Sequence, residues 1–351
     1  MVDYYSIYDL AYTTLFNDPK GMAANIDSTL LRSYPGANRL VKKQVVKEQS
    51  GLDYRWPVNL QGSSAATTFG AYHRPVRTVS SHMGRASMTL KNLRTDFSFD
   101  EVEDGMNAGA HEIVDMIKMR EQNAMIDLTD LIEGKIWGFA DTTDEESPQG
   151  FLYYFPYCAS QGFVGTVSGS HTTVAGLNPS TYTGWKSFGD VYVAVTKDDL
   201  IYRIKNAMTE TAFMNPLTNM MVPEFSSEKQ QWGLYCNKDT LFEIEDKAAD
   251  QNDNLGPDVD AMGGRAMIRG TQFTEVPKLS TTSNSFSTRD PVFGVNWGEV
   301  QNRVRSGYWM KRKILKDDPA QPLSVSVDVY CIYQLIVHNR RKGGFNIAKA
   351  A

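Results

Sequence analysis

The sequence predicts an α+β protein in which a long helix and a long strand, from opposite ends of the chain, flank a smaller α/β domain. Residues 100–133 carry the clearest helical periodicity, and residues 323–338 form an apolar, strand-like run. Between them, strand and helix patterns alternate from 150 to 280. The helix and the terminal strand are therefore expected to form a structural spine, with the α/β domain inserted between its halves.

The long helix is predicted from a start signal and from an apolar stripe. Ser98 and Glu101 have the spacing of a capping box, and further acids follow in the first turn. Residues 128–134 could instead form a separate short helix. An unbroken helix from 100 to 133 would be about 50 Å long at about 1.5 Å per residue. Its apolar face comprises Val102, Met106, Ala110, Ile113 and Ile117.

The terminal strand matches the helix in length. Residues 323–338 would span about 50 Å at about 3.3 Å per residue. A second strand is predicted over residues 305–315, just before it. A long helix and a long strand of equal length are more typical of an elongated structural protein than of a compact enzyme core.

Two further segments precede the helix. Residues 1–50 predict an arm with one short helix, which Pro35 and Gly36 interrupt. Residues 51–97 predict a long hairpin, whose tip at 62–75 is rich in small residues. Apolar and polar residues alternate poorly on its limbs, and no acid occurs from Tyr54 to Thr95. We therefore expect this hairpin to pack on another copy of the chain rather than on its own.

The inserted domain begins after a polar segment, residues 140–150, which contains Pro148. Thr196 is predicted to cap a helix with an apolar face, and residues 238–250 predict a second helix. Residues 231–237 and 266–279 predict strands. The apolar face of the first helix comprises Leu200, Ile204, Ala207 and Met208.

The sequence contains no motif for catalysis, cofactor binding or metal binding. It lacks the Walker and dinucleotide glycine patterns, and none of its five histidines has a ligand spacing. The segment 165–171, GTVSGSH, lacks the GxSxG nucleophile elbow. Asp198 and Asp199 fit the first turn of a helix. We therefore predict no catalytic residues, no cofactor and no metal. The three cysteines, predicted to be reduced and buried, are Cys158, Cys236 and Cys331.

Charge is separated along the chain. Residues 303–316 hold six basic residues among aromatics, and residues 243–260 hold seven acids and one lysine. The two runs suit pairing between copies, although the basic run alone would also suit nucleic acid. The formal charge is -5, which does not indicate a nucleic-acid binder. The N-terminus does not read as a signal peptide, and no apolar run is long enough to span a membrane.

The order of these segments resembles that of tailed-bacteriophage major capsid proteins with the Hong Kong 97-type fold. The residue stretches that carry the resemblance include LNPSTYTGW, DPVFGVNWGEV and VYCIYQLIVHNRRKGGFNIAK. The resemblance implies an N-arm, an E-loop, a P-domain in two parts and an inserted A-domain. Their expected bounds are 1–50 for the N-arm, 51–97 for the E-loop, 98–149 and 281–351 for the P-domain, and 150–280 for the A-domain.

The resemblance implies a structural protein that forms hexamers and pentamers of an icosahedral head around double-stranded DNA. Its implied partners are other copies, a portal, a separate scaffolding protein, non-specifically contacted DNA and, in some relatives, a decoration protein. It would be assembled in the host cytoplasm and reside in the virion. The hairpin tip lacks lysine, so covalent cross-linking is not expected. An encapsulin-like nanocompartment shell on the same fold is the alternative.

Subunit contacts are expected along the E-loop. Arg74, Arg77 and Arg85 would meet acids of an adjacent copy, while Trp56 and Phe69 would anchor the loop through apolar area. Two other classes of protein are open at this point. An α/β enzyme would need a nucleophile and a base, which we do not find. A nucleic-acid-binding protein would use the strand at 303–316.

Overall fold

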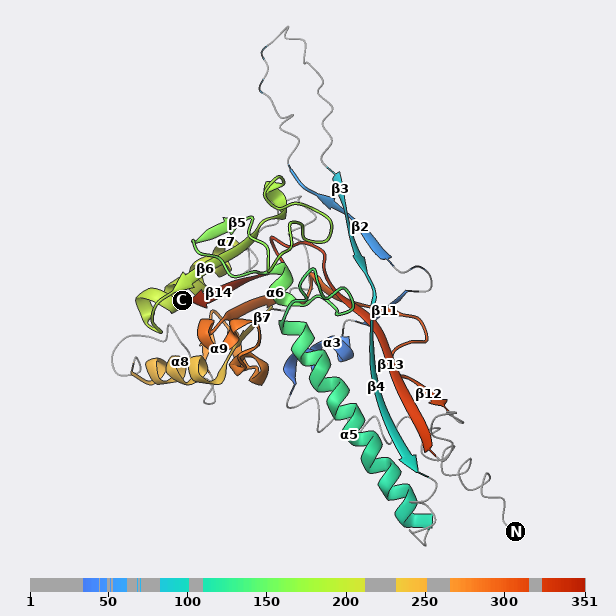
Figure 1. Ribbon diagram of the computed structural model, residues 1–351. Coiled ribbons are helices and arrows are strands. Elements are labelled where there is room, and N and C mark those ends of the chain that lie inside the picture. Colours follow the sequence, from blue (N-terminus) through green and yellow to red (C-terminus); the bar gives the residue numbers. More distant parts are fainter. Residues whose placement is uncertain are drawn as a thin grey trace, which may run out of the picture.

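The computed structural model describes most of the chain. The described residues are 34–43, 45–48, 51, 53–61, 68, 70, 83–100, 110–211, 232–250, 266–315 and 324–350. Within them, a long helix lies along one face of the first of two sheets, and a two-stranded hairpin projects from the body (Figure 1). The fold class predicted from the sequence is confirmed: a long helix and long strands carry an inserted α/β part and a projecting hairpin.

The first sheet, here called the spine sheet, is built on β13 (Ser324–Val337). One edge of β13 pairs antiparallel with β4 (Lys91–Asp100) over ten residues. The other edge pairs first with β12 (Lys311–Leu315) and then with β11 (Val300–Arg305). The strand β1 (Val45–Glu48) lies parallel to β11 and completes the sheet.

The helix α5 (Ala110–Trp137) lies along one face of the spine sheet (Figure 1). Side chains alternate along β4, so that Leu93 and Phe97 are buried while Arg94 is exposed. The two buried residues share one core with Leu128 and other residues of α5. Burial of each large apolar side chain contributes about 1.5–3 kcal/mol, which fixes the helix on the sheet.

The predicted start of the long helix is wrong. Ser98 lies in β4, where it pairs with Ser326, and β4 continues to Asp100. The acids after Ser98 resemble a helix start, but the ladder with β13 prevails over that local signal. Residues 101–109 lie outside the described part of the chain. Residues 128–134 continue α5 and do not form a separate helix.

The hairpin consists of β2 (Asp53–Asn59) and β3 (Met83–Thr89), which pair antiparallel. The chain passes from β3 into β4 within two residues, so residues 91–97 belong to the spine sheet rather than to the hairpin. Most of the predicted tip at 62–75 lies outside the described residues. Figure 1 shows β2 and β3 projecting from the body beyond the end of α5.

Pro35 begins the short arm helix α3 (Pro35–Lys43) instead of interrupting it. Proline suits the first helical position because it has no N–H to leave unpaired. The next two backbone N–H groups, of Gly36 and Ala37, donate to the buried carboxylate of Glu133 on α5. A side chain at position 36 would lie 2.9 Å from that carboxylate, so the close approach requires glycine.

The second sheet, here called the insert sheet, has seven strands in the order β5-β6-β14-β10-β7-β9-β8. Helices and short helical turns connect its strands. Its strands are β5 (Gly162–Val164), β6 (Ser187–Tyr192), β7 (Trp232–Cys236), β8 (Met267–Ile268), β9 (Thr271–Glu275), β10 (Val292–Asn296) and β14 (Gly344–Lys349). The helical elements are α6 (Phe151–Tyr154), a π-turn (Lys197–Ile201), α7 (Tyr202–Glu210), α8 (Lys238–Asp250), α9 (Phe286–Arg289) and the 3-10 turns Thr183–Trp185, Pro277–Ser280 and Ser283–Ser285.

Two strands of the insert sheet come from the predicted second part of the P-domain. Both β10 and β14 lie outside the bounds 150–280, yet they occupy the middle of the sheet. The strand β14 is parallel to β6 and antiparallel to β10. The end of the described chain is thus buried between two strands, which explains the apolar character of residues 344–349.

Several local predictions for the insert are confirmed. The Thr196 hydroxyl accepts a hydrogen bond from the backbone N–H of Asp199 at 3.2 Å. Ile204 and Met208 of α7 are buried in the core of the insert sheet. The segment 266–279 differs, because a turn with positive φ at Arg269 splits the expected strand into β8 and β9. Within the described residues, no helix has the length and hydropathy needed to cross a membrane.

Arg340 holds the junction between the two sheets. Its side chain is completely buried, and its guanidinium donates to three backbone carbonyl oxygens. Nε donates to Tyr154 at 2.5 Å, Nη2 to Thr166 at 2.9 Å and Nη1 to Trp185 at 3.2 Å. Burial lowers the pKa of Arg340 to about 10, so the side chain remains charged at neutral pH. One buried cation therefore fixes three segments that are distant in sequence.

Candidate subunit-interface surfaces

The base of the hairpin is attached to its own subunit. Trp56 and Ala86 are buried, and the Trp56 indole Nε1 donates to the carbonyl of His338 at 3.2 Å. The N–H of Ser87 donates to the carbonyl of Ala175 at 3.0 Å. The expectation that the whole hairpin packs on another copy is therefore wrong for its base. Because apolar and polar residues alternate poorly along the two strands of the hairpin, the sequence did not indicate these contacts.

A cluster of aromatic and basic side chains lies at this base. The Tyr54 and Trp56 rings are stacked at 5.5 Å, and His338 meets both rings edge-on. Arg303 of β11 lies over the Tyr54 ring at 3.9 Å and donates to its hydroxyl at 2.6 Å. Burial, with the positive charge of Arg303 as the second cause, lowers the pKa of His338 to about 4. The hairpin base thus rests on a neutral imidazole.

His338 should make stability depend on pH. An unfolded histidine titrates near pH 6.5, whereas folded His338 stays neutral down to about pH 4. The unfolded state therefore binds more protons between these values, and stability falls as the pH is lowered from about 6.5 to 4. We expect His338→Gln to flatten this part of the profile, measured as the urea midpoint between pH 4 and 7. An unchanged slope in the variant would contradict the assignment.

The predicted interface residues fall into two groups. Trp56 and Arg85 are described, whereas Phe69, Arg74 and Arg77 lie outside the described residues. Trp56 is 4% exposed within its own chain, so its ring anchors the hairpin to its own body and offers little surface to a neighbour.

Arg85 occupies the other face of the hairpin. It is exposed on β3, opposite Pro57, and Arg55 of β2 is exposed as well. Met83, at the end of β3, is 76% exposed. This mixed basic and apolar face is available for contact with another molecule.

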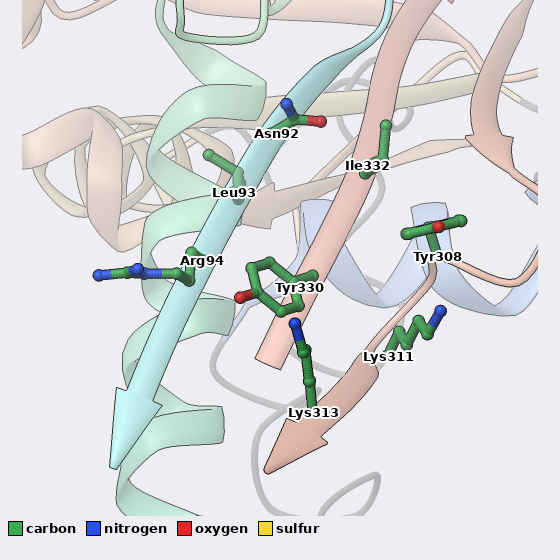
Figure 2. A pocket seen from close by; sticks show the side chains of 8 residues that line it. All are labelled: Asn92, Leu93, Arg94, Tyr308, Lys311, Lys313, Tyr330 and Ile332. Carbon is green, nitrogen blue, oxygen red and sulfur yellow. The ribbon is translucent and has the colours of Figure 1, made fainter. Parts of the chain in front are cut away.

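The face of the spine sheet opposite α5 carries a groove with a volume of about 590 Å³. Figure 2 shows the Tyr330 ring in the space between β4 and β12, with Arg94 on one side, Lys313 on the other and Lys311 beside Tyr308. Sequence reasoning singled out the basic run at 303–316 but missed the contributions of β4 and β13. Alternation along 91–98 and 326–332 was the signal that could have found them. The lining comprises Asn92, Leu93, Arg94, Tyr308, Lys311, Lys313, Tyr330 and Ile332.

The basic run does not act as one surface. Arg312 points to the α5 side of the sheet, where it forms an ion pair with Glu121 at 2.6 Å. Glu121 is completely buried, and burial raises its pKa although Arg312 opposes the shift. Lys311 and Lys313 point to the opposite face, into the groove. The predicted partner run, 243–260, is described only as far as Asp250, so pairing between the two runs stays a prediction.

The candidate chemical groups have structural roles in the described part of the chain. The Ser168 hydroxyl donates to the carbonyl of Leu152 within a loop. Cys158, Cys236 and Cys331 are free and buried, as predicted, and burial raises the pKa of each thiol. No group of three or more potential metal ligands occurs among the described residues.

Solved structures share this arrangement, although no protein-family model and no curated protein sequence matches the chain. A capsid protein of cyanophage A-1(L) aligns with a TM-score of 0.59 at 12% identity, over 90% of this chain and 92% of that chain. The mature capsid of bacteriophage PhiM1 gives 0.53 at 10% identity, over 88% and 85%. The capsid of Myoviridae phage XM1 gives 0.50 at 12% identity, over 87% and 90%.

The chain therefore has the fold of phage capsid shell proteins. This fold is the Hong Kong 97 type.

Proposed function

We propose that this chain is the major capsid subunit of a tailed phage, which assembles into the hexamers and pentamers of an icosahedral head. The observation that carries the proposal is the fold, shared over about nine-tenths of the chain with three phage capsid structures. The three alignments span 87–90% of this chain and 85–92% of the matched chains.

The shape of the subunit supports this role. The hairpin projects from the body (Figure 1). Its exposed side chains include Met83, Arg55 and Arg85. A projecting hairpin with a mixed basic and apolar face gains stability when a neighbouring subunit covers it. Obligate interfaces bury about 2,000 Å² or more, and many such contacts in a closed shell give one stable particle.

The proposed partners follow from the same role. They are other copies of the chain, a portal, a separate scaffolding protein and double-stranded DNA contacted without sequence preference; a decoration protein is a further candidate. The subunit would assemble in the host cytoplasm and reside in the virion. A formal charge of -5 suits a wall around DNA, because a strongly basic wall would retain the genome it must release. The proposed subunit has no catalytic role.

Electron microscopy of the purified full-length protein tests the proposal. We expect shells, sheets or tubes, whereas small monodisperse monomers at all concentrations would contradict it. A triple variant, Arg74→Glu/Arg77→Glu/Arg85→Glu, should not form normal particles, because it reverses three charges of the proposed hairpin contact. The matched control, Arg74→Lys/Arg77→Lys/Arg85→Lys, keeps the charges and should assemble. If the glutamate variant formed normal particles, the proposed contact through these hairpin arginines would be contradicted.

A further inference from the structure

The groove on the spine sheet has an ordered chemical pattern. Lys311, Tyr330 and Arg94 lie directly opposite one another on three adjacent strands. In Figure 2, Lys313 reaches toward the Tyr330 ring, whereas the Arg94 guanidinium points away from it. Lys313 lies two residues beyond Lys311 on the same face of β12, and Ile332 lies two residues beyond Tyr330 on β13. Lys311 also lies over the Tyr308 ring at 4.3 Å. The floor is thus aromatic and aliphatic, and the rim is cationic.

This pattern selects the chemistry of an occupant. The residues that line the groove include three cations and no acid, although Asp96 lies 3.9 Å from Arg94 and Asp328 lies opposite Lys313 on the adjacent strand. The Tyr330 hydroxyl already donates to Asp328 at 2.6 Å, so it does not serve as a donor to a phosphate. A phosphate backbone would leave the apolar floor without a partner, whereas a peptide with both acidic and apolar side chains would satisfy floor and rim together.

Outside the described residues, one segment combines three acids with five aromatic residues. Residues 1–19 carry Asp3, Asp9 and Asp18 and no basic side chain, since the first is Lys20. They also carry five aromatic residues. The acidic segments 101–109 and 251–260 have no aromatic residue and match only the rim. The aromatic residues of the N-terminal segment are Tyr4, Tyr5, Tyr8, Tyr12 and Phe16.

The position of the arm helix favours binding between copies. The helix α3 packs against α5, on the face of the spine sheet opposite the groove. The segment would have to pass around an edge of its own sheet to reach its own groove. Thirty-three residues precede Tyr34, and an extended chain of that length spans about 110 Å, enough to reach another subunit.

We propose that residues 1–19 of one copy bind in the groove formed by β4, β12 and β13 of a neighbouring copy, with acids on Lys311, Lys313 and Arg94 and rings on Tyr308 and Tyr330. The proposal rests on the assembly function proposed above and names the contact partner of one surface.

Photo-cross-linking within assembled particles tests this contact. Full-length chain carrying Tyr330→p-azidophenylalanine is prepared with natural nitrogen and with ¹⁵N, mixed in equal amounts before assembly, irradiated and digested. We expect the major cross-linked peptide, identified by mass spectrometry, to come from residues 1–19, with both isotopes within single cross-linked pairs. Cross-links to other segments, to nucleic acid or to another protein, or cross-links confined to one isotope, would overturn the proposal.

Charge exchange provides the second measurement. The variant Lys311→Glu/Lys313→Glu should lower the yield of the 1–19 cross-link about tenfold, and adding Asp3→Lys/Asp9→Lys should restore it to within about twofold. The control Lys311→Arg/Lys313→Arg should leave the yield unchanged. An undiminished yield in the glutamate variant overturns the charge pairing. If particles form but their cross-links lie elsewhere, only this contact is refuted. If no particles form at all, both this contact and the proposed assembly function are contradicted.

Discussion

Replacing Arg340 with alanine is expected to unfold the junction between the two sheets. The substitution removes three hydrogen bonds and leaves the carbonyl oxygens of Tyr154, Thr166 and Trp185 buried without their donor. An unsatisfied buried polar group costs about 1–3 kcal/mol, so the free energy of unfolding should fall by about 3 kcal/mol or more. Urea unfolding of the purified protein, followed by tryptophan fluorescence, measures the loss.

The neighbouring arginine is the natural control for this experiment. Arg341 is exposed and lies over the Phe163 ring at 4.1 Å. An exposed cation–ring contact is worth about 0.5–1 kcal/mol, so Arg341→Ala should change stability by no more than that. Arg340→Lys should recover little, because an ammonium group cannot reproduce the planar fork that reaches three carbonyls. Equal effects of Arg340→Ala and Arg341→Ala would refute the junction role of Arg340.

Replacing Glu133 with alanine is expected to release the arm helix from the spine helix. The Glu133 carboxylate is completely buried, and it accepts hydrogen bonds from Ala37 N–H at 2.6 Å, Trp137 Nε1 at 2.7 Å and Gly36 N–H at 3.1 Å. The variant leaves these donors without an acceptor, at a cost of about 2–4 kcal/mol. Limited proteolysis should then cleave the chain near residues 34–43, which the native docking protects.

The same contact gives a steric test. Gly36→Ala places a methyl group 2.9 Å from one Glu133 carboxylate oxygen and 3.0 Å from Trp137 Nε1. It should therefore expose the arm helix to protease, as Glu133→Ala does. The control is Asp127→Ala, which removes an exposed carboxylate from the same helix α5. If the arm stayed protected from protease in Glu133→Ala, another contact would hold α3. The same would follow if Asp127→Ala lost this protection.

The sequence was sufficient for the general architecture because the spine elements are long. The predicted bounds of the terminal strand agree with β13 to within one residue at each end. The helix at 238–250 and the strand at 232–236 also lie at the positions that the sequence predicts. The start of α5 was misplaced because an acid-rich segment after Ser98 satisfies helix-start preferences locally. Only the partner strand β13, more than 200 residues away, decides that Ser98–Asp100 is extended.

The surfaces were less predictable than the fold. Alternation in β12 indicates that Lys311 and Lys313 share a face, but no local pattern shows that Arg94 lies in the same row. Likewise, Trp56 was expected to contact a neighbour, whereas the carbonyl of His338, 282 residues away, accepts its indole N–H. Contacts that join distant segments depend on the register of the sheet, which the sequence does not state locally.

The central position of β14 has a consequence for incomplete chains. A translation product that stops before Gly344 would contain both β6 and β10, yet each would lack its partner in the middle of the sheet. Unpaired strand edges are prone to aggregate and to be degraded. Shortened copies would thus be prone to aggregation and degradation, so the order of strands in the insert sheet favours chains that extend through β14.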